Sequence, residues 1–184
     1  MFPAFNTLGR LVRQLGQASR SLVLTLVVSA AALVGIAGHE AYRGEAYRDP
    51  AGIPTLGYGE TAGVKMGDKT TPERALIQLK KSADLHAQGI RRCITAPLFQ
   101  YEFDAYLDLA YNIGVGAFCA KARPGKPPTL IDLINAERYE EACERILRFN
   151  TAFNPKAGQR EVLRGLTIRR EQNRRVCLGL ERRP

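Results

Sequence analysis

The sequence predicts an α+β fold that is mostly helical, with one small β region ahead of a helical remainder. Residues 49–63, DPAGIPTLGYGETAG, are dense in proline and glycine and carry isolated β-forming side chains. Several later segments repeat apolar residues every three or four positions, which is the period of an amphipathic helix. The length of 184 residues fits one domain of ordinary size with an N-terminal extension.

The extension contains an uncharged apolar segment at residues 21–38, SLVLTLVVSAAALVGIAG. As a helix it would be about 27 Å long, near the lower limit for crossing a hydrocarbon core of about 30 Å. Half of its residues are small or weakly polar, so it would gain little free energy on entering a bilayer. Arg10, Arg13 and Arg20 precede it and no acidic residue occurs before Glu40, which predicts a cytoplasmic N-terminus. The expected division of the chain is a basic cytoplasmic N-terminus at 1–20, a weak membrane helix at 21–38 and an external domain at 39–184.

Two other interpretations of the apolar segment remain open. A cleavable signal peptide fits the small residues Gly35 and Ala37, although the polar lead and the apolar run are both long for one. A buried core helix is the second alternative, although the segment lacks the polar face typical of a helix packed at a surface. We favour a span that is held weakly by the membrane.

The residues after the apolar segment begin with a short helix-compatible pattern at 40–47, which Asp49 and Pro50 end. The turn-rich residues that follow predict a small hairpin region. A long helix is predicted to start at Thr71, an N-cap residue followed by Pro72 at the first helical position.

Four further segments predict the helical remainder. A second long helix is expected where Phe99, Phe103 and Tyr106 recur at helical spacing. Glycine and proline mark a loop at 121–129 and a turn at 154–158. The other expected helices are 130–136, 140–149 and a basic helix or broken pair of helices over 160–180.

The composition suggests where the protein works. A formal net charge of +9 favours a polyanionic partner such as nucleic acid, anionic lipid or an acidic cell-wall polymer. The four cysteines show no C-x-x-C pair and only two histidines occur, so a zinc site is poorly supported and we expect no metal and no cofactor. An even cysteine count beside an export-like segment predicts two disulfides in an oxidising compartment.

Two carboxylates and one hydroxyl near the predicted hairpin could perform glycoside hydrolysis. That reaction needs an acid to protonate the leaving oxygen and a second group to handle water. Glu40 and Asp49 could face one cleft, with the hydroxyl of Thr55 positioning water beside Asp49. Acids nine residues apart are common, so this spacing has meaning only in its setting; Glu45 is interpreted as a solvated acid.

The setting resembles the T4-type phage lysozymes, which form glycoside hydrolase family 24. The catalytic segment of that family carries Glu, Asp and Thr at these spacings, with A-Y-x-D before a hairpin and T-[LI]-G-[YI]-G on it. Here the matches are Glu40, AYRD at 46–49 and TLGYG at 55–59. Residues 97–118 are similar to the family's central helix, and 165–178 to its closing segment.

The resemblance implies a lysozyme-like fold with a small N-terminal hairpin region and a helical C-terminal lobe. It implies hydrolysis of the β-1,4 bond between N-acetylmuramic acid and N-acetylglucosamine in peptidoglycan. Glu40 would be the general acid, and Asp49 and Thr55 would hold and activate the attacking water, which implies inversion. Many relatives have histidine where this chain has Glu60, which puts a structural pairing in doubt but leaves the three catalytic residues.

A weak span joined to such a domain resembles the signal-anchor-release endolysins, which are inactive in the membrane and active once released to the periplasm. While residues 21–38 are embedded, Glu40 would be held at the lipid interface. The same resemblance implies a monomer whose action depends on a holin or pinholin. For the disulfides, four cysteines allow three pairings, of which we favour Cys93–Cys119 and Cys143–Cys177.

Two rival functions are less well supported. Eight arginines between 160 and 183 could bind nucleic acid, but no stacking-aromatic or recognition-helix motif accompanies them. A membrane-lesion protein is disfavoured because a single marginal span precedes a large cysteine-bearing domain. Asp104 and Asp108, one helical turn apart, are interpreted as a solvated helix face rather than a metal pair.

Overall fold

The computed structural model describes residues 19–49, 52–155 and 157–181. The expected cytoplasmic N-terminus therefore lies outside the described residues except for residues 19 and 20. The elements, in chain order, are η1 (Val23–Thr25), α2 (Ala30–Glu40), β1 (Arg43–Arg48), β2 (Pro54–Gly57), α3 (Pro72–Arg91), α4 (Gln100–Ile113), α5 (Val115–Phe118), α6 (Leu130–Asn135), α7 (Tyr139–Arg145), η2 (Ile146–Arg148), β3 (Thr151–Asn154), β4 (Gln159–Val162) and α8 (Arg164–Cys177).

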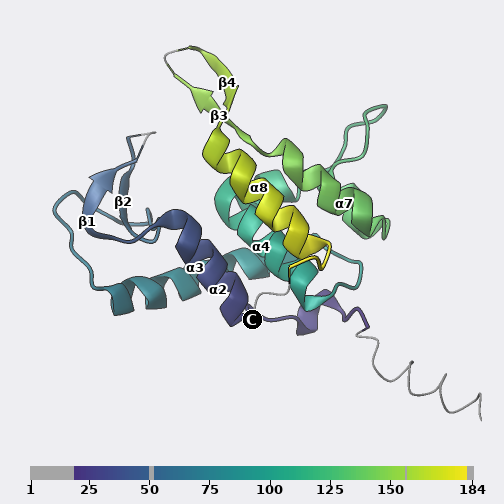
Figure 1. Ribbon diagram of the computed structural model, residues 1–184, viewed down its shortest axis with the longest axis horizontal. Coiled ribbons are helices and arrows are strands. Elements are labelled where there is room, and N and C mark those ends of the chain that lie inside the picture. The colour runs from purple at the N-terminus through teal and green to yellow at the C-terminus, as the bar shows by residue number, and fades with distance from the viewer. Residues whose placement is uncertain (1–18, 50–51, 156, 182–184) are drawn as a thin grey trace, which may run out of the picture.

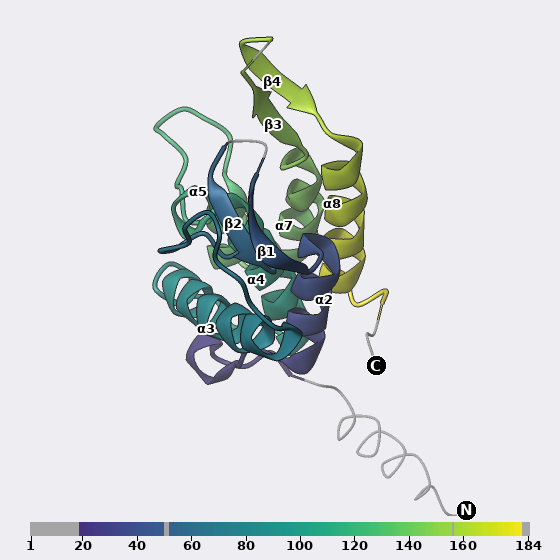
Figure 2. The ribbon, with the colours of Figure 1, turned by 90° about the vertical axis from the view of Figure 1, so that its left-hand side faces the viewer.

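Helix α4 is the centre of the fold. It packs against α2, α3, α5 and α8, which surround it in Figures 1 and 2. Its apolar residues recur at helical spacing, and Phe103, Tyr106 and Leu107 have no solvent exposure. Burial of such side chains stabilises the fold by about 1.5–3 kcal/mol each. The mostly helical α+β prediction is confirmed.

Within the described residues, the strands form two separate antiparallel hairpins. Strand β1 pairs with β2, and β3 pairs with β4 in the register Thr151↔Val162 to Asn154↔Gln159. Figure 1 shows the first hairpin to one side of the helical body and the second projecting beyond the start of α8. The second hairpin was missed in the sequence, where residues 154–158 were interpreted only as a turn.

The prediction of a short helix over residues 40–47 is wrong, because α2 ends at Glu40 and β1 begins at Arg43. Ala41 has a positive φ of 52°, which an L-residue rarely adopts and which stops the helix. Backbone bonds from a distant loop then fix the extended conformation. The amide of Ala46 donates to the carbonyl of Asp68, and the carbonyl of Gly44 accepts from the amide of Thr70. Long-range pairing here outweighs the local preference.

The apolar segment at 21–38 is divided into two parts that both pack on the domain. Ser21 exchanges two backbone hydrogen bonds with Leu98, and η1 follows. Helix α2 then starts after Ser29, whose hydroxyl accepts from the amide of Ala32 and donates to Asp104. Among the described residues, no helix has the length and apolar character that crossing a membrane requires. The boundary expected between residues 38 and 39 falls inside α2.

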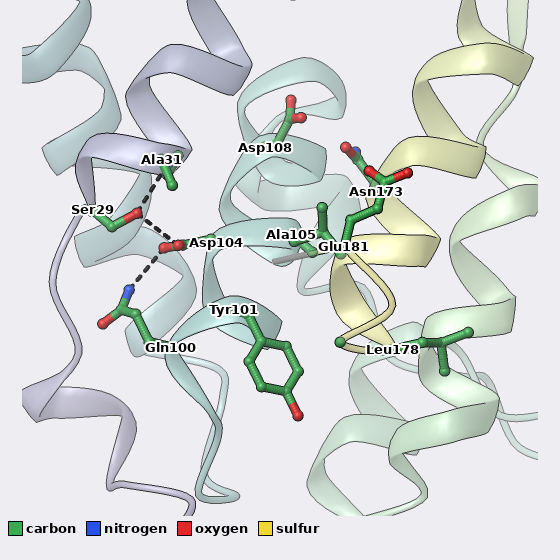
Figure 3. A pocket seen from close by; sticks show the side chains of 13 residues that line it. Ser29, Ala31, Gln100, Tyr101, Asp104, Ala105, Asp108, Asn173, Leu178 and Glu181 are labelled. Carbon is green, nitrogen blue, oxygen red and sulfur yellow. Dashed lines mark hydrogen bonds between the residues drawn. The ribbon is translucent and has the colours of Figure 1, made fainter. Parts of the chain in front are cut away.

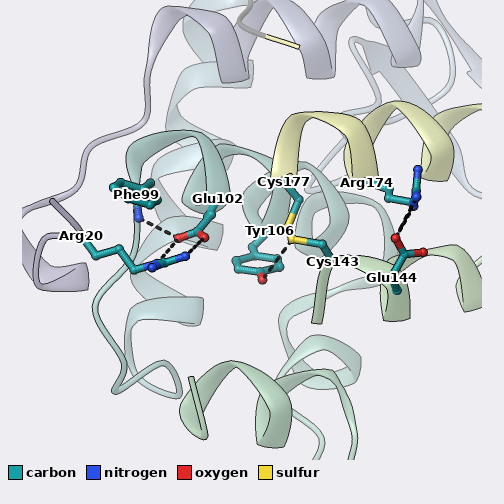
Figure 4. The surroundings of a disulfide bond; sticks show 8 residues. All are labelled: Arg20, Phe99, Glu102, Tyr106, Cys143, Glu144, Arg174 and Cys177. Atoms are coloured by element: carbon teal, nitrogen blue, oxygen red, sulfur yellow. Dashed lines mark hydrogen bonds and ion pairs between the residues drawn. A yellow bond between two sulfur atoms is a disulfide. The ribbon is translucent and has the colours of Figure 1, made fainter. Parts of the chain in front are cut away.

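The two disulfides join the favoured pairs. Cys93–Cys119 links the residues after α3 to the end of α5, and Cys143–Cys177 links α7 to the end of α8. Figure 4 shows the second bridge close to Tyr106 in the core. The loops closed by these bonds span 26 and 34 residues, a range in which a disulfide contributes about 3–4 kcal/mol.

Candidate active site

Glu40 is the last residue of α2, and the packing of this helix on α4 fixes its position. Ala32 and Ile36 bury the inner face of α2, with 3 % and 0 % exposure, and α2 lies on α4. The strained backbone of Ala41 turns the chain away immediately after Glu40. The carboxylate of Glu40 therefore projects from the end of a packed helix, with 21 % of the side chain exposed.

Two neighbours hold this carboxylate. Nη1 of Arg169 on α8 donates to Glu40 Oε1 at 2.7 Å. On the other side lies Gly59, where a Cβ atom would stand only 3.0 Å from Glu40 Oε2. Gly59 also has a φ of 85°, so glycine is required there both for the backbone conformation and for the approach of the carboxylate. The glycine-rich hairpin motif is thus packed directly against the candidate acid.

Asp49, just after β1, and Thr55, on β2, both form a hydrogen bond with Ile53, which lies between the two strands. Oδ1 of Asp49 accepts from the amide of Ile53 at 2.8 Å, and the hydroxyl of Thr55 donates to the carbonyl of Ile53 at 3.0 Å. Thr55 is 3 % exposed. The structure therefore groups these two residues on the hairpin whose far end meets Glu40 at Gly59.

Behind Glu40, Arg169 is shared with a second carboxylate. Its Nε and Nη2 both donate to Asp108 Oδ1, at 3.1 and 2.5 Å. The side chain of Asp108 is only 4 % exposed, so the interpretation of Asp108 as part of a solvated face is wrong. A buried charge needs a partner, and its partner comes from a helix 61 residues further along the chain.

Further polar groups complete the surroundings of Asp108. Nε2 of His39 lies 3.5 Å from its Oδ2. With its amide oriented to satisfy both neighbours, Asn173 donates to the same oxygen at 2.7 Å and accepts from Nη1 of Arg170 at 3.1 Å. Burial, together with the positive charge of Arg169, lowers the pKa of Arg170 to about 10. Arg170 stays charged at neutral pH.

Tyr111 on α4 faces the same group of charges. Burial raises its pKa to about 12, with Glu40 and Glu60 contributing repulsion of the phenolate. Its hydroxyl donates to the carbonyl of Tyr58 at 3.3 Å, which ties the hairpin to α4. Tyr111 is therefore a neutral donor at physiological pH.

The other acids near the hairpin have separate partners. Glu60 accepts from the amides of Thr61 and Ala62 and from Nε2 of Gln78 at 2.9 Å. Glu45 is 72 % exposed and pairs with Lys69, as expected of a solvated acid.

A cavity of about 530 Å³ lies between the start of α2, α4 and the end of α8. Figure 3 shows Ser29 and Gln100 bound to Asp104 at one side of it and Asp108 and Asn173 at another. Glu40, Asp49 and Thr55 do not line this cavity. It is therefore a different feature from the site that contains the candidate catalytic residues.

Comparison with known proteins decides the family. Residues 37–173 match the family model described as phage lysozyme. The chain belongs to the phage lysozyme family. It is 36 % identical over 150 residues to the SAR-endolysin of Pseudomonas phage phiKMV, an alignment covering 81 % of this chain and 87 % of the relative.

Solved structures agree with this assignment. The endolysin from Escherichia coli O157:H7 phage FAHEc1 superposes with a TM-score of 0.76 and 30 % identity, covering 87 % of this chain and 98 % of that one. The active form of the P1 phage endolysin Lyz gives a TM-score of 0.68 at 26 % identity, covering 99 % of this chain and 98 % of that one. This phage lysozyme is a glycoside hydrolase of the muramidase type.

Sequence reasoning missed the arginine and aspartate behind Glu40 in this phage lysozyme. Arg169 and Arg170 were counted in a basic tail, yet they are 6 % and 0 % exposed. The two arginines are adjacent on α8 and lie in the block that is similar to the family's closing segment. This position was the available signal that they belong to the site. The apolar residues on both sides of Asp108 were the available signal for its burial.

Proposed function

We propose that this phage lysozyme is an endolysin that hydrolyses the β-1,4 bond between N-acetylmuramic acid and N-acetylglucosamine in host peptidoglycan. The observation that carries the proposal is the position of Glu40, packed between Arg169 and Gly59 at the hairpin that also holds Asp49 and Thr55. Glu40 is the general acid that protonates the leaving oxygen.

Asp49 and Thr55 act on water at the hairpin turn. The amide of Ile53 already orients one oxygen of Asp49, and a carboxylate can accept several hydrogen bonds. The hydroxyl of Thr55, buried and held by the same residue, directs the water toward Asp49. Attack by this water on the face opposite the leaving group inverts the anomeric carbon.

The reaction is tested on purified peptidoglycan with the oxidised full-length protein and Glu40→Gln. A muramidase releases fragments with N-acetylmuramic acid at the reducing end, which mass spectrometry after borohydride reduction identifies. We expect these fragments from the wild-type protein and almost none from Glu40→Gln. Reduced N-acetylglucosamine ends, or full activity of Glu40→Gln, would contradict the proposed bond or the proposed acid.

We also propose that residues 21–38 have two locations, the inner membrane and the surface of α4. The segment carries no charge, and its small residues bind it only weakly to a bilayer. Once docked as in this structure, it presents Ile36 to the core and leaves Val34 71 % exposed. Glu40 reaches Arg169 only when α2 is docked, so the anchored protein is inactive and the released periplasmic protein is active.

Contacts of Arg20 and the residues after it stabilise the released form. Arg20 forms two hydrogen bonds with Glu102, at 2.8 and 3.1 Å, and stacks on the rings of Phe99 and Tyr139. Figure 4 shows Arg20 and Glu102 beside the core. Cleavage after Ala37 would remove these contacts together with most of α2, which favours release of the intact chain over a cleaved signal peptide.

Fractionation of cells tests the two locations. Before depolarisation, full-length protein is expected in the inner membrane with its N-terminus in the cytoplasm; afterwards it is expected in the periplasm at unchanged mass. A holin or pinholin would supply the depolarisation, and the released enzyme acts as a monomer on peptidoglycan without nucleic acid. A product shortened to about residue 38 would favour the signal-peptide alternative.

A further inference from the structure

The sharing of Arg169 between two carboxylates has a chemical consequence for Glu40. Arg169 gives one hydrogen bond to Glu40 and two to Asp108. The side chains of Arg169 and Asp108 are 7 % and 4 % exposed, and Glu40 is the more accessible partner at 21 %. Asp108 therefore takes the buried side of the guanidinium, and Glu40 takes the side that faces outward.

A general acid must carry a proton when the substrate binds. An arginine in contact with a carboxylate favours its ionised form, which opposes this requirement. Low exposure strengthens the effect because little water screens the pair. With Arg169 alone behind it, Glu40 would be held as a carboxylate that cannot protonate the leaving oxygen.

Asp108 compensates the charge of Arg169. When Glu40 is protonated, Arg169 and Asp108 still form a neutral pair; without Asp108 the arginine would face a neutral acid and keep its full charge. The remaining charged or titratable groups around Glu40 come from several elements. They are His39 on α2, Glu60 after β2, Tyr111 on α4 and Arg170 on α8.

We propose that Asp108 is a positioning residue that acts through Arg169: it orients the guanidinium that contacts Glu40 and offsets its charge during proton transfer. This inference rests on the assignment of Glu40 as the general acid. In this role Asp108 acts on Glu40 through Arg169 and does not itself take part in the reaction. Asn173 donates to the second oxygen of Asp108 and so fixes the side of the carboxylate that Arg169 meets.

The test compares the pH dependence of reducing-end release from purified peptidoglycan for the wild type, Asp108→Asn and Asp104→Asn. Asp104 lies one turn earlier on α4 and binds Ser29 and Gln100, so its substitution makes the same charge change elsewhere on the helix. Loss of Asp108's charge should move the alkaline fall in activity to lower pH by about one unit. Asp104→Asn should leave it in place.

A swap keeps the proposal falsifiable if Asp108→Asn folds poorly. The double variant Asp108→Asn with Asn173→Asp returns one negative charge to the same polar cluster, and its pH profile should return toward that of the wild type. Equal loss of activity at every pH in folded Asp108→Asn, or the same shift in Asp104→Asn, would overturn the proposal. If Glu40→Gln stays active, the assignment of the acid has failed instead.

Discussion

Helix α4 carries two buried carboxylates, Glu102 and Asp108, and each is paired with an arginine from a distant part of the chain. Arg20 brings the start of the described chain to Glu102, whereas Arg169 brings α8 to Asp108. We call the first pair closed, because both oxygens of Glu102 accept hydrogen bonds from Arg20 and one of them also accepts from the amide of Phe99. In the second, the arginine is shared with Glu40.

With Glu40 as the proposed general acid, this difference separates a structural pair from a functional one. A closed pair can only stabilise the state in which it forms, which here is the docked state of residues 19–38. A shared arginine leaves one carboxylate able to change its protonation while the charge behind it stays compensated. If substitutions at the two pairs had the same effects on activity and on stability, this distinction would be wrong.

The largest expected effect separates Glu40 from Glu102. Glu40→Gln should lower the rate of glycan cleavage by about 10²- to 10⁴-fold, because glutamine cannot donate the proton. Its thermal unfolding midpoint should stay close to that of the wild type. Glu102→Gln should do the reverse, with a lower midpoint and a nearly normal rate per folded molecule, as measured by calorimetry and reducing-end release.

The next effect concerns the closed pair itself. Arg20→Ala leaves Glu102 buried without its charge partner and should lower the free energy of unfolding by about 2 kcal/mol, allowing for the partial exposure of Arg20. Arg20→Lys should fall between, because lysine keeps the charge but loses the planar two-bond contact.

A matched control comes from an exposed pair on the surface. Arg138 binds Glu141 with similar geometry, yet both side chains are about half exposed. Arg138→Ala should therefore not change the unfolding midpoint measurably. Equal losses in Arg20→Ala and Arg138→Ala would show that the Arg20 contact does not hold the segment in place.

A smaller effect tests the contact between Glu40 and the hairpin. Gly59→Ala should destabilise the protein by about 1–2 kcal/mol because of its positive φ, and should also lower the rate by displacing the carboxylate. Gly63 has a similar φ of 73° but nothing near the position of a Cβ. Gly63→Ala should reproduce the loss of stability without the loss of rate. A loss of rate in both variants would show that the approach of Gly59 to the Glu40 carboxylate is not what the reaction depends on.

The smallest effect concerns a carboxylate that accepts hydrogen bonds from uncharged donors. The amide and hydroxyl of Thr129 and the amide of Ala122 lower the pKa of Asp132 at the start of α6. A lowered pKa in the folded state stabilises above the unfolded value of about 4, and the contribution disappears as pH falls through the folded value. Asp132→Asn should cost about 1 kcal/mol at neutral pH and nothing in strong acid, in urea titrations across pH.

Local signals were enough to predict much of the fold. Thr71 and Pro72 mark the start of α3, and the recurring aromatic residues mark α4, because caps and helical periodicity act within a few residues. Strand β1 was predicted as helix because its partners, which are β2 and the backbone of Asp68 and Thr70, lie outside its own local pattern. The hairpin β3–β4 was missed for a different reason: its strands are only four residues long, too short to show a clear alternating pattern.

The site divides in the same way. The motif around Glu40, Asp49 and Thr55 is contiguous and could be recognised from the sequence. Asp108 was assigned to the surface because an aspartate on a helix is usually solvated, and only its partner on α8 makes burial tolerable. Residues 21–38 looked like a single helix, but their packing against Leu98 and α4 divides them in two.

Residues 21–38 are proposed to anchor the inactive protein and, after release, to hold Glu40 in the active one. Thr25 and Ala30 have exposed side chains in the docked state, so leucine at both positions would strengthen a membrane span with little cost to the fold. The direct measurement is the membrane-bound fraction of Thr25→Leu/Ala30→Leu against the onset of lysis, with Thr25→Ser/Ala30→Ser as control. The leucine variant should be active when purified, stay in the membrane after depolarisation and delay lysis. Lysis at the wild-type time while the protein remains in the membrane would contradict it.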